Sequence, residues 1–195
     1  MKSGTTLYVV RHGETDWNVA GRLQGHTDTP LNDRGRAQAT QNGIRLLDQK
    51  LDLGAIDFIA SPLSRAYETM ELLRGAMGLP IAGFATDHRL KELSYGRCEG
   101  STWSQLPPVD IHGVERAQDP FNWRPDGGES YSDAMLRIAD WLSGISRDAI
   151  VVTHGGITRA LRGLAGGIPH QKVPTLKVPQ DRVLVLRDGT MRWMQ

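Results

Sequence analysis

Short apolar runs alternate along the chain with longer segments in which apolar residues recur every three or four positions. Four runs have the length of buried strands: residues 7–10, 56–60, 149–153 and 183–186. Three longer segments have the spacing of helices with one buried face: residues 37–51, 63–77 and 131–145. This alternation predicts an α/β fold, a three-layer α/β/α sandwich around a mostly parallel sheet.

Each expected helix has a stripe of residues that is predicted to face the core. The first stripe is Ala37, Thr40, Ile44, Leu47 and Leu51. The second helix is expected to begin with Ser61 as its N-cap and Pro62 in its first turn. Its stripe is Leu63, Ala66, Met70, Leu73 and Met77. The third stripe is Tyr131, Ala134, Ile138, Trp141 and Ile145.

Residues 101–128 interrupt this regular pattern. They hold four of the ten prolines and show little periodicity. The final segment, 183–195, predicts a hairpin that turns at Asp188-Gly189. No composition shift marks a domain boundary, so residues 1–195 are expected to form a single domain with a short cap-like insertion at about 101–128.

Three of the apolar runs and their flanks end in polar residues that suit anion binding. The first is followed by Arg11 and His12, the second by Ser61 and Arg65, and the third by His154 and two glycines. Ligands of open α/β sheets bind at the carboxyl ends of parallel strands. If these strands are parallel neighbours, two histidines and two arginines meet in a pocket that suits phosphate.

The histidines extend the chemistry of this pocket beyond binding. Arginine stays protonated and cannot attack phosphorus, whereas a neutral imidazole offers a lone pair. One histidine could be the nucleophile, and the other, if protonated, could stabilise the phosphoryl charge. The leaving oxygen still needs a proton from a carboxyl group. The candidates for this acid are Glu14, Glu92, Glu99 and Glu129.

Five segments, in order, resemble motifs of the histidine phosphatase superfamily, in its phosphoglycerate-mutase-like branch (branch 1). They are RHGETDWNVAGRLQGHTDTPL at 11–31, SPLSRA at 61–66, LKELSYGRCEG at 90–100, GGES at 127–130 and VVTHGG at 151–156. Cys98 departs from the pattern, because many relatives carry tryptophan there. Five motifs in one order make the resemblance far more specific than any one of them.

The resemblance implies a role for each matching residue. His12 is expected to be the phosphorylated nucleophile, and Glu92 the general acid that later acts as the base. Contacts to the phosphoryl oxygens are expected from Arg11, Arg65, His154 and the backbone N–H of Gly155. Asn18 and Gln24 are expected to contact the phosphate or the substrate. The family needs no metal, so neither a metal nor another cofactor is expected; Glu14 and Glu129 are expected to orient the basic residues.

We therefore predict a metal-independent phosphatase that hydrolyses a small-molecule phosphate monoester through a phosphohistidine on His12. A phosphoglycerate mutase is the first alternative, and a non-catalytic phosphate-binding module is the second. A mutase must shield its phosphoenzyme from water, and the short insertion and the lack of a tail after the hairpin argue against such a lid. A metal site at His12 and His154 is disfavoured, because the neighbouring arginines would repel a cation.

Composition narrows the partners and the compartment. The formal net charge of +1 argues against nucleic acid or an anionic membrane as a partner. No apolar stretch approaches the ~18 residues of a membrane span. The N-terminus lacks a signal-peptide pattern and Cys98 is the one cysteine, so a cytoplasmic location is expected. The partner is expected to be a small phosphorylated molecule; the sequence identifies neither the ester nor the oligomeric state.

Overall fold

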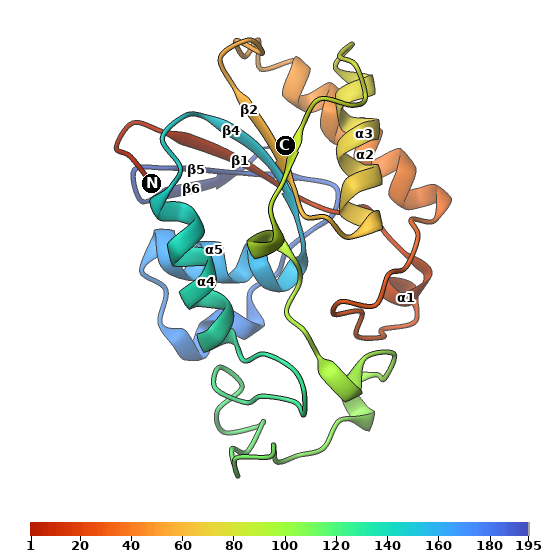
Figure 1. Ribbon diagram of the computed structural model, residues 1–195, viewed down its shortest axis with the longest axis vertical. Helices are drawn as coiled ribbons and strands as arrows, with labels where there is room; N and C mark the ends of the chain where they lie inside the picture. The colour runs from red at the N-terminus through yellow and green to blue at the C-terminus, as the bar shows by residue number, and fades with distance from the viewer. Residues whose placement is uncertain (195) are drawn as a thin grey trace.

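A computed structural model describes residues 1–194 and confirms the α/β fold with a mostly parallel sheet (Figure 1). The strands are β1 (Thr6–Arg11), β2 (Asp57–Ala60), β3 (Ala85–Thr86), β4 (Ala149–Thr153), β5 (Val183–Arg187) and β6 (Thr190–Trp193). The α-helices are α1 (Asp16–Val19), α2 (Asp33–Leu47), α3 (Ser64–Ala76), α4 (Tyr131–Ser143) and α5 (Gly155–Gly166). Four short 3₁₀ helices are η1 (His88–Leu90), η2 (Gly96–Cys98), η3 (Trp103–Gln105) and η4 (His170–Thr175).

The six strands form one sheet in the order β3-β2-β4-β1-β5-β6. The pairs β3–β2, β2–β4 and β4–β1 are parallel, whereas β5 pairs antiparallel with both β1 and β6. The hairpin of β5 and β6 turns through Asp188 and Gly189, which both have positive φ, as a two-residue turn of this kind requires. The predicted hairpin is confirmed, and the three strands with polar ends are parallel neighbours.

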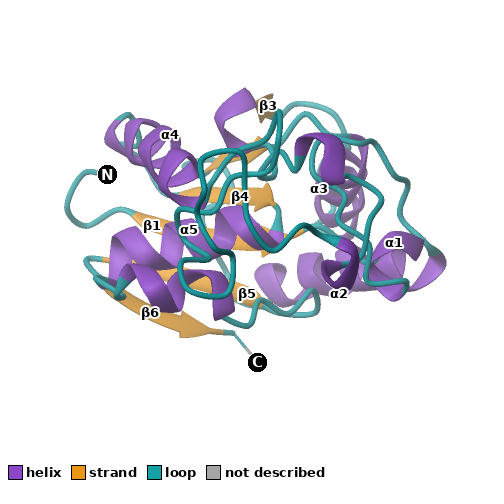
Figure 2. Cartoon of the chain, turned by 90° about the horizontal axis from the view of Figure 1, so that it is seen from below, coloured by secondary structure: helices purple, strands orange, loops and turns teal. Residues whose placement is uncertain are grey.

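Helices cover both faces of the sheet, as Figure 2 shows from below. On one face, Val151 of β4 packs in a core with Ile138 of α4 and residues of α5. On the other face, Ile150 and Val152 of the same strand pack with Met70 of α3. Alternate residues of a strand point to opposite faces, so the fully buried run of β4 serves both cores. The predicted three-layer arrangement is confirmed.

The predicted buried face of the first helix is wrong. Ile44 and Leu47 of α2 are 39% and 44% exposed, and Ala37 and Thr40 are also exposed. The buried residues are instead Gly35, Ala39, Asn42, Gly43 and Leu46. An ideal Cβ at Gly43 would lie 2.5 Å from the carbonyl oxygen of Leu73, so α2 and α3 touch backbone to backbone. Close approach selects small residues for this interface, which apolar periodicity does not reveal.

The second helix keeps its predicted stripe but begins later than expected. Leu63, not Ser61, is the N-cap of α3, and Pro62 lies before the helix. Ser61 follows β2 and its hydroxyl contacts His154, at 2.7 Å from Nε2. The predicted stripe of this helix is buried: Leu63, Ala66, Met70, Leu73 and Met77.

Residues 101–128 are largely irregular, with η3 as their one named element among the described residues. Phe121 and Trp123 pack in the same core as α4 and α5, while Trp103 is 50% exposed. In Figure 1 this green segment lies below the sheet and its helices. No helix within residues 1–194 is both long and apolar enough to cross a membrane.

Candidate active site

The parallel strands β1, β4 and β2 deliver the candidate residues to one edge of the sheet. Arg11 pairs with Thr153 in the register of β1 and β4, and the backbone N–H of His12 donates to the carbonyl of Thr153 at 2.8 Å. The N–H of Ser61 donates to Val152 at 2.9 Å. The rings of His12 and His154 lie with their centroids 5.1 Å apart. The convergence that the sequence predicted is therefore confirmed.

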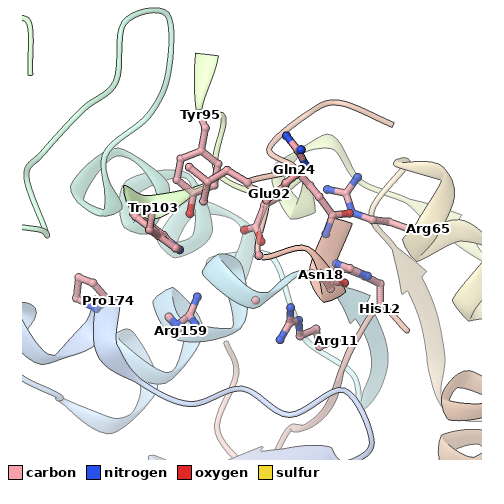
Figure 3. A pocket seen from close by; sticks show the side chains of 14 residues that line it. Arg11, His12, Asn18, Gln24, Arg65, Glu92, Tyr95, Trp103, Arg159 and Pro174 are labelled. Carbon is pink, nitrogen blue, oxygen red and sulfur yellow. The ribbon is translucent and has the colours of Figure 1, made fainter. Parts of the chain in front are cut away.

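A pocket of about 290 Å³ opens at this edge (Figure 3). Seven of the eight candidate residues line it: Arg11, His12, Asn18, Gln24, Arg65, Glu92 and Gly155. The eighth, His154, is fully buried next to His12 and does not line the pocket. The remaining lining residues are Gly21, Arg22, Leu23, Tyr95, Trp103, Arg159 and Pro174.

The geometry of His12 leaves one ring nitrogen with a lone pair. Its Nδ1 lies 2.7 Å from the carbonyl oxygen of Gly13, which can only accept a hydrogen bond. The proton of the neutral ring is therefore on Nδ1, and Nε2 is unprotonated. Burial, together with Arg65 and Arg11, lowers the pKa of His12 well below 6.5. A buried, neutral imidazole with its Nε2 lone pair available is suited to nucleophilic attack.

His154 is held in the opposite tautomer by Ser61. The hydroxyl of Ser61 accepts from the N–H of Leu63 at 3.4 Å, so its own proton points to Nε2 of His154 at 2.7 Å. Nδ1 then carries the proton, and this buried atom has no partner within the described residues. Burial and the nearby basic groups lower the pKa of His154 well below 6.5, so both histidines are neutral in the free protein.

Arg11 and Arg65 are anchored to backbone carbonyls and to no carboxylate. Arg65 donates from Nη1 to Thr27 at 2.9 Å and from Nη2 to Gly25 at 2.7 Å. Arg11 donates from Nη1 to Val178 at 2.8 Å. The Nε atoms of both arginines are buried and unpartnered among residues 1–194. Burial lowers the pKa of Arg11 to about 10, so both groups remain cationic and suited to an oxyanion.

Glu92 is the one carboxylate that the described residues contribute to the pocket lining. Its Oε2 accepts from the N–H of Gly156 at 3.1 Å, and its Oε1 from the N–H of Leu93 at 3.0 Å. An ideal Cβ at Gly156 would lie 2.5 Å from Oε1 of Glu92, so a side chain there would displace the carboxylate. Glycine at this position is thus required by the approach of Glu92 to α5.

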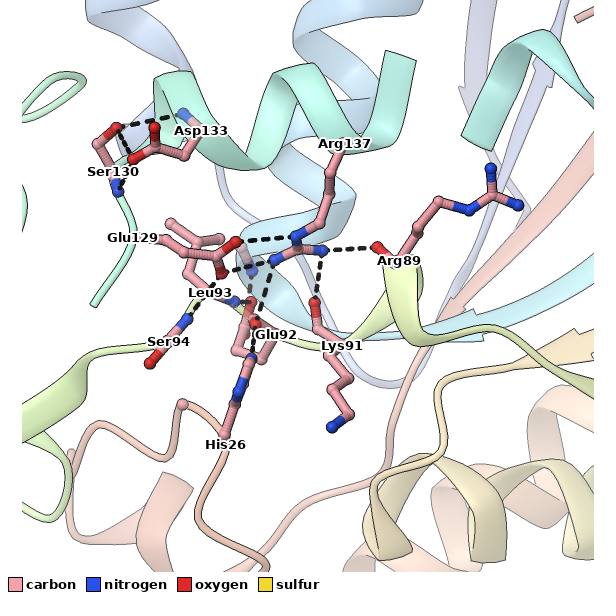
Figure 4. A network of polar contacts seen from close by, with 12 residues as sticks. His26, Arg89, Lys91, Glu92, Leu93, Ser94, Glu129, Ser130, Asp133 and Arg137 are labelled. Carbon is pink, nitrogen blue, oxygen red and sulfur yellow. Dashed lines mark hydrogen bonds and ion pairs between the residues drawn. The ribbon is translucent and has the colours of Figure 1, made fainter. Parts of the chain in front are cut away.

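A network around Arg137 fixes the backbone that carries Glu92 (Figure 4). Arg137 of α4 donates to the carbonyls of Arg89, Lys91 and Glu92. Its guanidinium also pairs with Glu129, at 2.8 Å from Nη2 to Oε2. Arg137 therefore holds three carbonyls of one loop at once. Sequence reasoning missed it, because its partners are backbone groups that the sequence does not distinguish.

The other three glutamates serve different parts of the structure. Glu14 lies 3.4 Å from Arg34, Glu129 pairs with Arg137, and neither contacts the pocket arginines. The prediction that Glu14 and Glu129 orient the basic residues is therefore wrong. Glu99 accepts from the N–H groups of His26 and Thr27 and thereby shapes the loop whose carbonyls bind Arg65.

The amides of Asn18 and Gln24 are oriented by contacts to their oxygens. Oδ1 of Asn18 accepts from the N–H of Thr15 at 3.1 Å and from Nε2 of Gln180 at 3.0 Å. Oε1 of Gln24 accepts from the hydroxyl of Thr29. Because the oxygens are occupied, each amide presents its NH₂ group as the donor available to a ligand. Donors on the pocket wall suit phosphoryl oxygens.

The pocket also holds functional side chains that sequence reasoning missed. Arg159 lies on α5, five residues after His154, and Tyr95 lies three residues after Glu92. In Figure 3 both point into the pocket. The signal for Arg159 was its place in the first turns of the helix that follows the glycines. A cluster of three or more His, Cys, Asp or Glu side chains that could hold a metal does not occur in the described part of the chain.

Comparisons with known proteins agree with this site. A family model described as the histidine phosphatase superfamily (branch 1) matches residues 7–194. A glucosyl-3-phosphoglycerate phosphatase of Mycolicibacterium vanbaalenii is 31% identical over 182 residues, covering 87% of this chain and 78% of that protein. A 2,3-bisphosphoglycerate-dependent phosphoglycerate mutase of Beijerinckia indica is 28% identical over 199 residues, covering 93% and 90%. The structure of a mycobacterial glucosyl-3-phosphoglycerate phosphatase with VO3 matches with a TM-score of 0.74 and 28% identity, covering 98% of both chains.

Proposed function

The chain belongs to the histidine phosphatase superfamily (branch 1), and from this premise we propose that it hydrolyses a small-molecule phosphate monoester through a phosphohistidine on His12. The observation that carries the role of His12 is its tautomer. The ring lines the pocket, donates from Nδ1 to Gly13 and keeps a lone pair on Nε2. Arg11 and Arg65 flank it with buried guanidinium groups, as a phosphoryl group requires.

In the first step, Nε2 of His12 attacks phosphorus. The N–P bond forms as the ester P–O bond breaks, and protonated Glu92 gives its proton to the leaving oxygen. Arg11 and Arg65 hold the phosphoryl oxygens through the transition state, and the Nδ1–H of His154 is directed at the same group. The alcohol product leaves, and Glu92 is then a carboxylate.

In the second step, water attacks the phosphohistidine. The carboxylate of Glu92 takes a proton from the water as the new P–O bond forms. The N–P bond breaks, its electron pair returns to Nε2 of His12, and inorganic phosphate leaves. Glu92 is protonated again and the cycle closes. The backbone N–H groups of Leu93 and Gly156 keep the carboxylate in place for both transfers.

The reaction needs no metal in this proposal. Two guanidinium groups supply the positive charge that a metal would otherwise bring to the phosphoryl oxygens. The NH₂ groups of Asn18 and Gln24 and the N–H of Gly155 add neutral donors. We place the enzyme in the cytoplasm as a single domain, with the segment 101–128 acting as a cap over the pocket, which Trp103 of that segment lines.

A phosphate monoester, His12→Ala and a chelator together test the proposal. The wild type should hydrolyse p-nitrophenyl phosphate, and rapid acid or alkaline quench should trap label on His12. His12→Ala should lower kcat by at least about 10⁴-fold, because the nucleophile is lost. The control His112→Ala changes an exposed histidine and should keep full activity. Full activity of His12→Ala, or loss of wild-type activity with a chelator, contradicts the proposal.

The similarity to a mutase gives the second reaction to examine. A mutase would return the phosphoryl group to the product instead of to water. Incubation with 3-phosphoglycerate and a bisphosphorylated primer should release inorganic phosphate without accumulating 2-phosphoglycerate. Isomerisation that is faster than phosphate release would show that transfer to water is the minor path.

A further inference from the structure

The pocket wall beyond Arg11 carries a cation that no step of the proposed reaction uses. Arg159 lies on α5, and an ideal Cβ at Gly155 would be 3.4 Å from Nε of Arg11 and 3.6 Å from Nη1 of Arg159. The two guanidinium groups therefore flank the same backbone position. Figure 3 shows Arg159 on the side of Arg11 away from His12, toward Trp103. A phosphate held by Arg11 and His12 would extend its ester group toward this side.

Arg159 is held in a fixed orientation by neutral partners. Its Nε donates to the carbonyl of Leu176 at 2.8 Å, and its Nη1 donates to the hydroxyl of Tyr131 at 3.4 Å. A guanidinium has five N–H groups, so these contacts leave donors for a ligand in the pocket that Arg159 lines. An arginine that is already ordered loses little side-chain entropy when it binds an anion.

The charge of Arg159 is not balanced within the protein. No ion pair joins it to a carboxylate among residues 1–194, and the acceptors that hold it are a carbonyl and a phenol. Four arginines line the pocket against the single carboxylate of Glu92. A partly buried cation without a counter-ion is unfavourable unless a ligand supplies the negative charge. One phosphate dianion leaves this excess only partly compensated.

We propose that Arg159 binds a second negatively charged group, a carboxylate or a phosphate, on the leaving part of the substrate. The substrate class is then phosphate monoesters whose alcohol carries a further negative charge. This inference rests on the proposed phosphatase function and adds the specificity of the same pocket. Arg159 selects the substrate and takes no part in the transfer of the phosphoryl group.

A purely structural role would be to fasten α5 to the segment around residue 176. Arg162, one turn further along α5, has that role: its Nη1 donates to the carbonyl of Lys177 at 2.9 Å, and its guanidinium lies over Trp193. Arg162 does not line the pocket. Arg162→Gln is thus a matched control for Arg159→Gln, with the same helix, the same substitution and the same kind of carbonyl partner.

Two pairs of esters separate the added charge from the rest of the substrate. 3-Phosphoglycerate and glycerol 1-phosphate share a carbon skeleton and differ in a carboxylate. Fructose 1,6-bisphosphate and fructose 6-phosphate differ in a second phosphate. Initial phosphate release gives kcat/KM for each ester, and the wild type should prefer the charged member of at least one pair by about tenfold or more. The preferred pair identifies the anionic group.

Arg159→Gln should lower kcat/KM for the preferred ester by about tenfold and leave its uncharged counterpart within about threefold. Arg159→Lys should recover part of the preference, because it restores the charge but not the fork of donors. Arg162→Gln should leave both values near the wild type. The inference is overturned if the wild type shows no preference in either pair, or if Arg159→Gln lowers both members equally. Absence of turnover with every ester would instead contradict the phosphatase function, and the inference with it.

Discussion

His12 and His154 face each other across 5.1 Å with their ring planes tilted by 57°, and both rings are buried. The sequence suggested that the second histidine could be protonated. The structure favours a neutral form, because burial and the charges of Arg65 and Arg11 lower the pKa of both rings. His154 therefore acts as a neutral donor through Nδ1, and the arginines supply the positive charge of the free pocket.

The buried histidines should make the stability of the protein depend on pH. Their folded pKa values lie below the unfolded value of about 6.5, so below that pH the unfolded chain binds more protons than the folded protein. This contribution is fully present above about pH 7.5 and is lost as the pH falls. The free energy of unfolding should decrease between pH 7 and 5, with each histidine contributing up to about 1.4 kcal/mol per pH unit.

Urea unfolding at a series of pH values measures this slope. The double variant His12→Gln/His154→Gln should show a shallower decrease than the wild type, whatever its stability at pH 7.5. The slope is the readout, because the substitutions also change packing. An identical slope in both proteins would mean that the two rings are protonated in the folded state.

Glu92→Gln should reveal the two proton transfers separately. The alcohol of glycerol 1-phosphate needs a proton as it leaves, so we expect kcat/KM for this ester to fall by about 10²–10⁴-fold. p-Nitrophenolate is a better leaving group and should still depart. The phosphoenzyme should then accumulate, because the variant lacks the base for water. Stopped-flow records should show a burst of p-nitrophenol followed by slow turnover.

Glu14→Gln is the matched control for this experiment. Glu14 follows the nucleophile closely in sequence, yet its carboxylate contacts Arg34 and the amide of Asn32 outside the pocket. Its variant should retain wild-type rates with both esters. If Glu14→Gln and Glu92→Gln have equal effects, Glu92 is not the proton donor.

Arg137 should act on the reaction through Glu92. Its removal would free the carbonyls of Arg89, Lys91 and Glu92, and the loop could then move its carboxylate away from the pocket. Arg137→Met should lower kcat about tenfold or more, with a small change in KM. It should also make the rate more sensitive to the leaving group, as Glu92→Gln does.

Combining the two changes tests this coupling. Arg137→Met should have little further effect on kcat in a Glu92→Gln background, because both act through one carboxylate. Arg89→Met is the control: Arg89 has surface ion pairs with Asp87 and Asp140 in the same region, and its loss should leave kcat near the wild type. Additive effects of Arg137→Met and Glu92→Gln would assign Arg137 a role in stability alone.

Much of the site could be predicted because its main groups follow buried strands. Arg11, His12 and His154 come directly after β1 and β4, where an apolar run stops and polar residues begin. The parallel pairing of these strands then brings the groups together. Local chemistry along the chain was therefore enough to indicate a phosphate pocket.

The remaining parts of the site depend on contacts that no local pattern encodes. Four glutamates were candidates for the acid, and the folding of the loop after η1 brings Glu92 to the N–H of Gly156. Arg159 follows His154 on α5 but reaches the pocket because Leu176 and Tyr131 direct its side chain. Both placements rest on residues far apart in sequence.

Neighbouring residues of α2 test why periodicity failed in that helix. In an exposed helix, Gly→Ala stabilises by about 0.5–1 kcal/mol. Gly43→Ala should instead destabilise by about 2 kcal/mol or more, because the new Cβ would lie 2.5 Å from the carbonyl oxygen of Leu73 and 2.8 Å from Cβ of Ala76. Ile44→Ala removes an exposed side chain and should change the free energy of unfolding by less than about 0.5 kcal/mol. Equal effects in urea unfolding would mean that α2 packs through its apolar stripe after all.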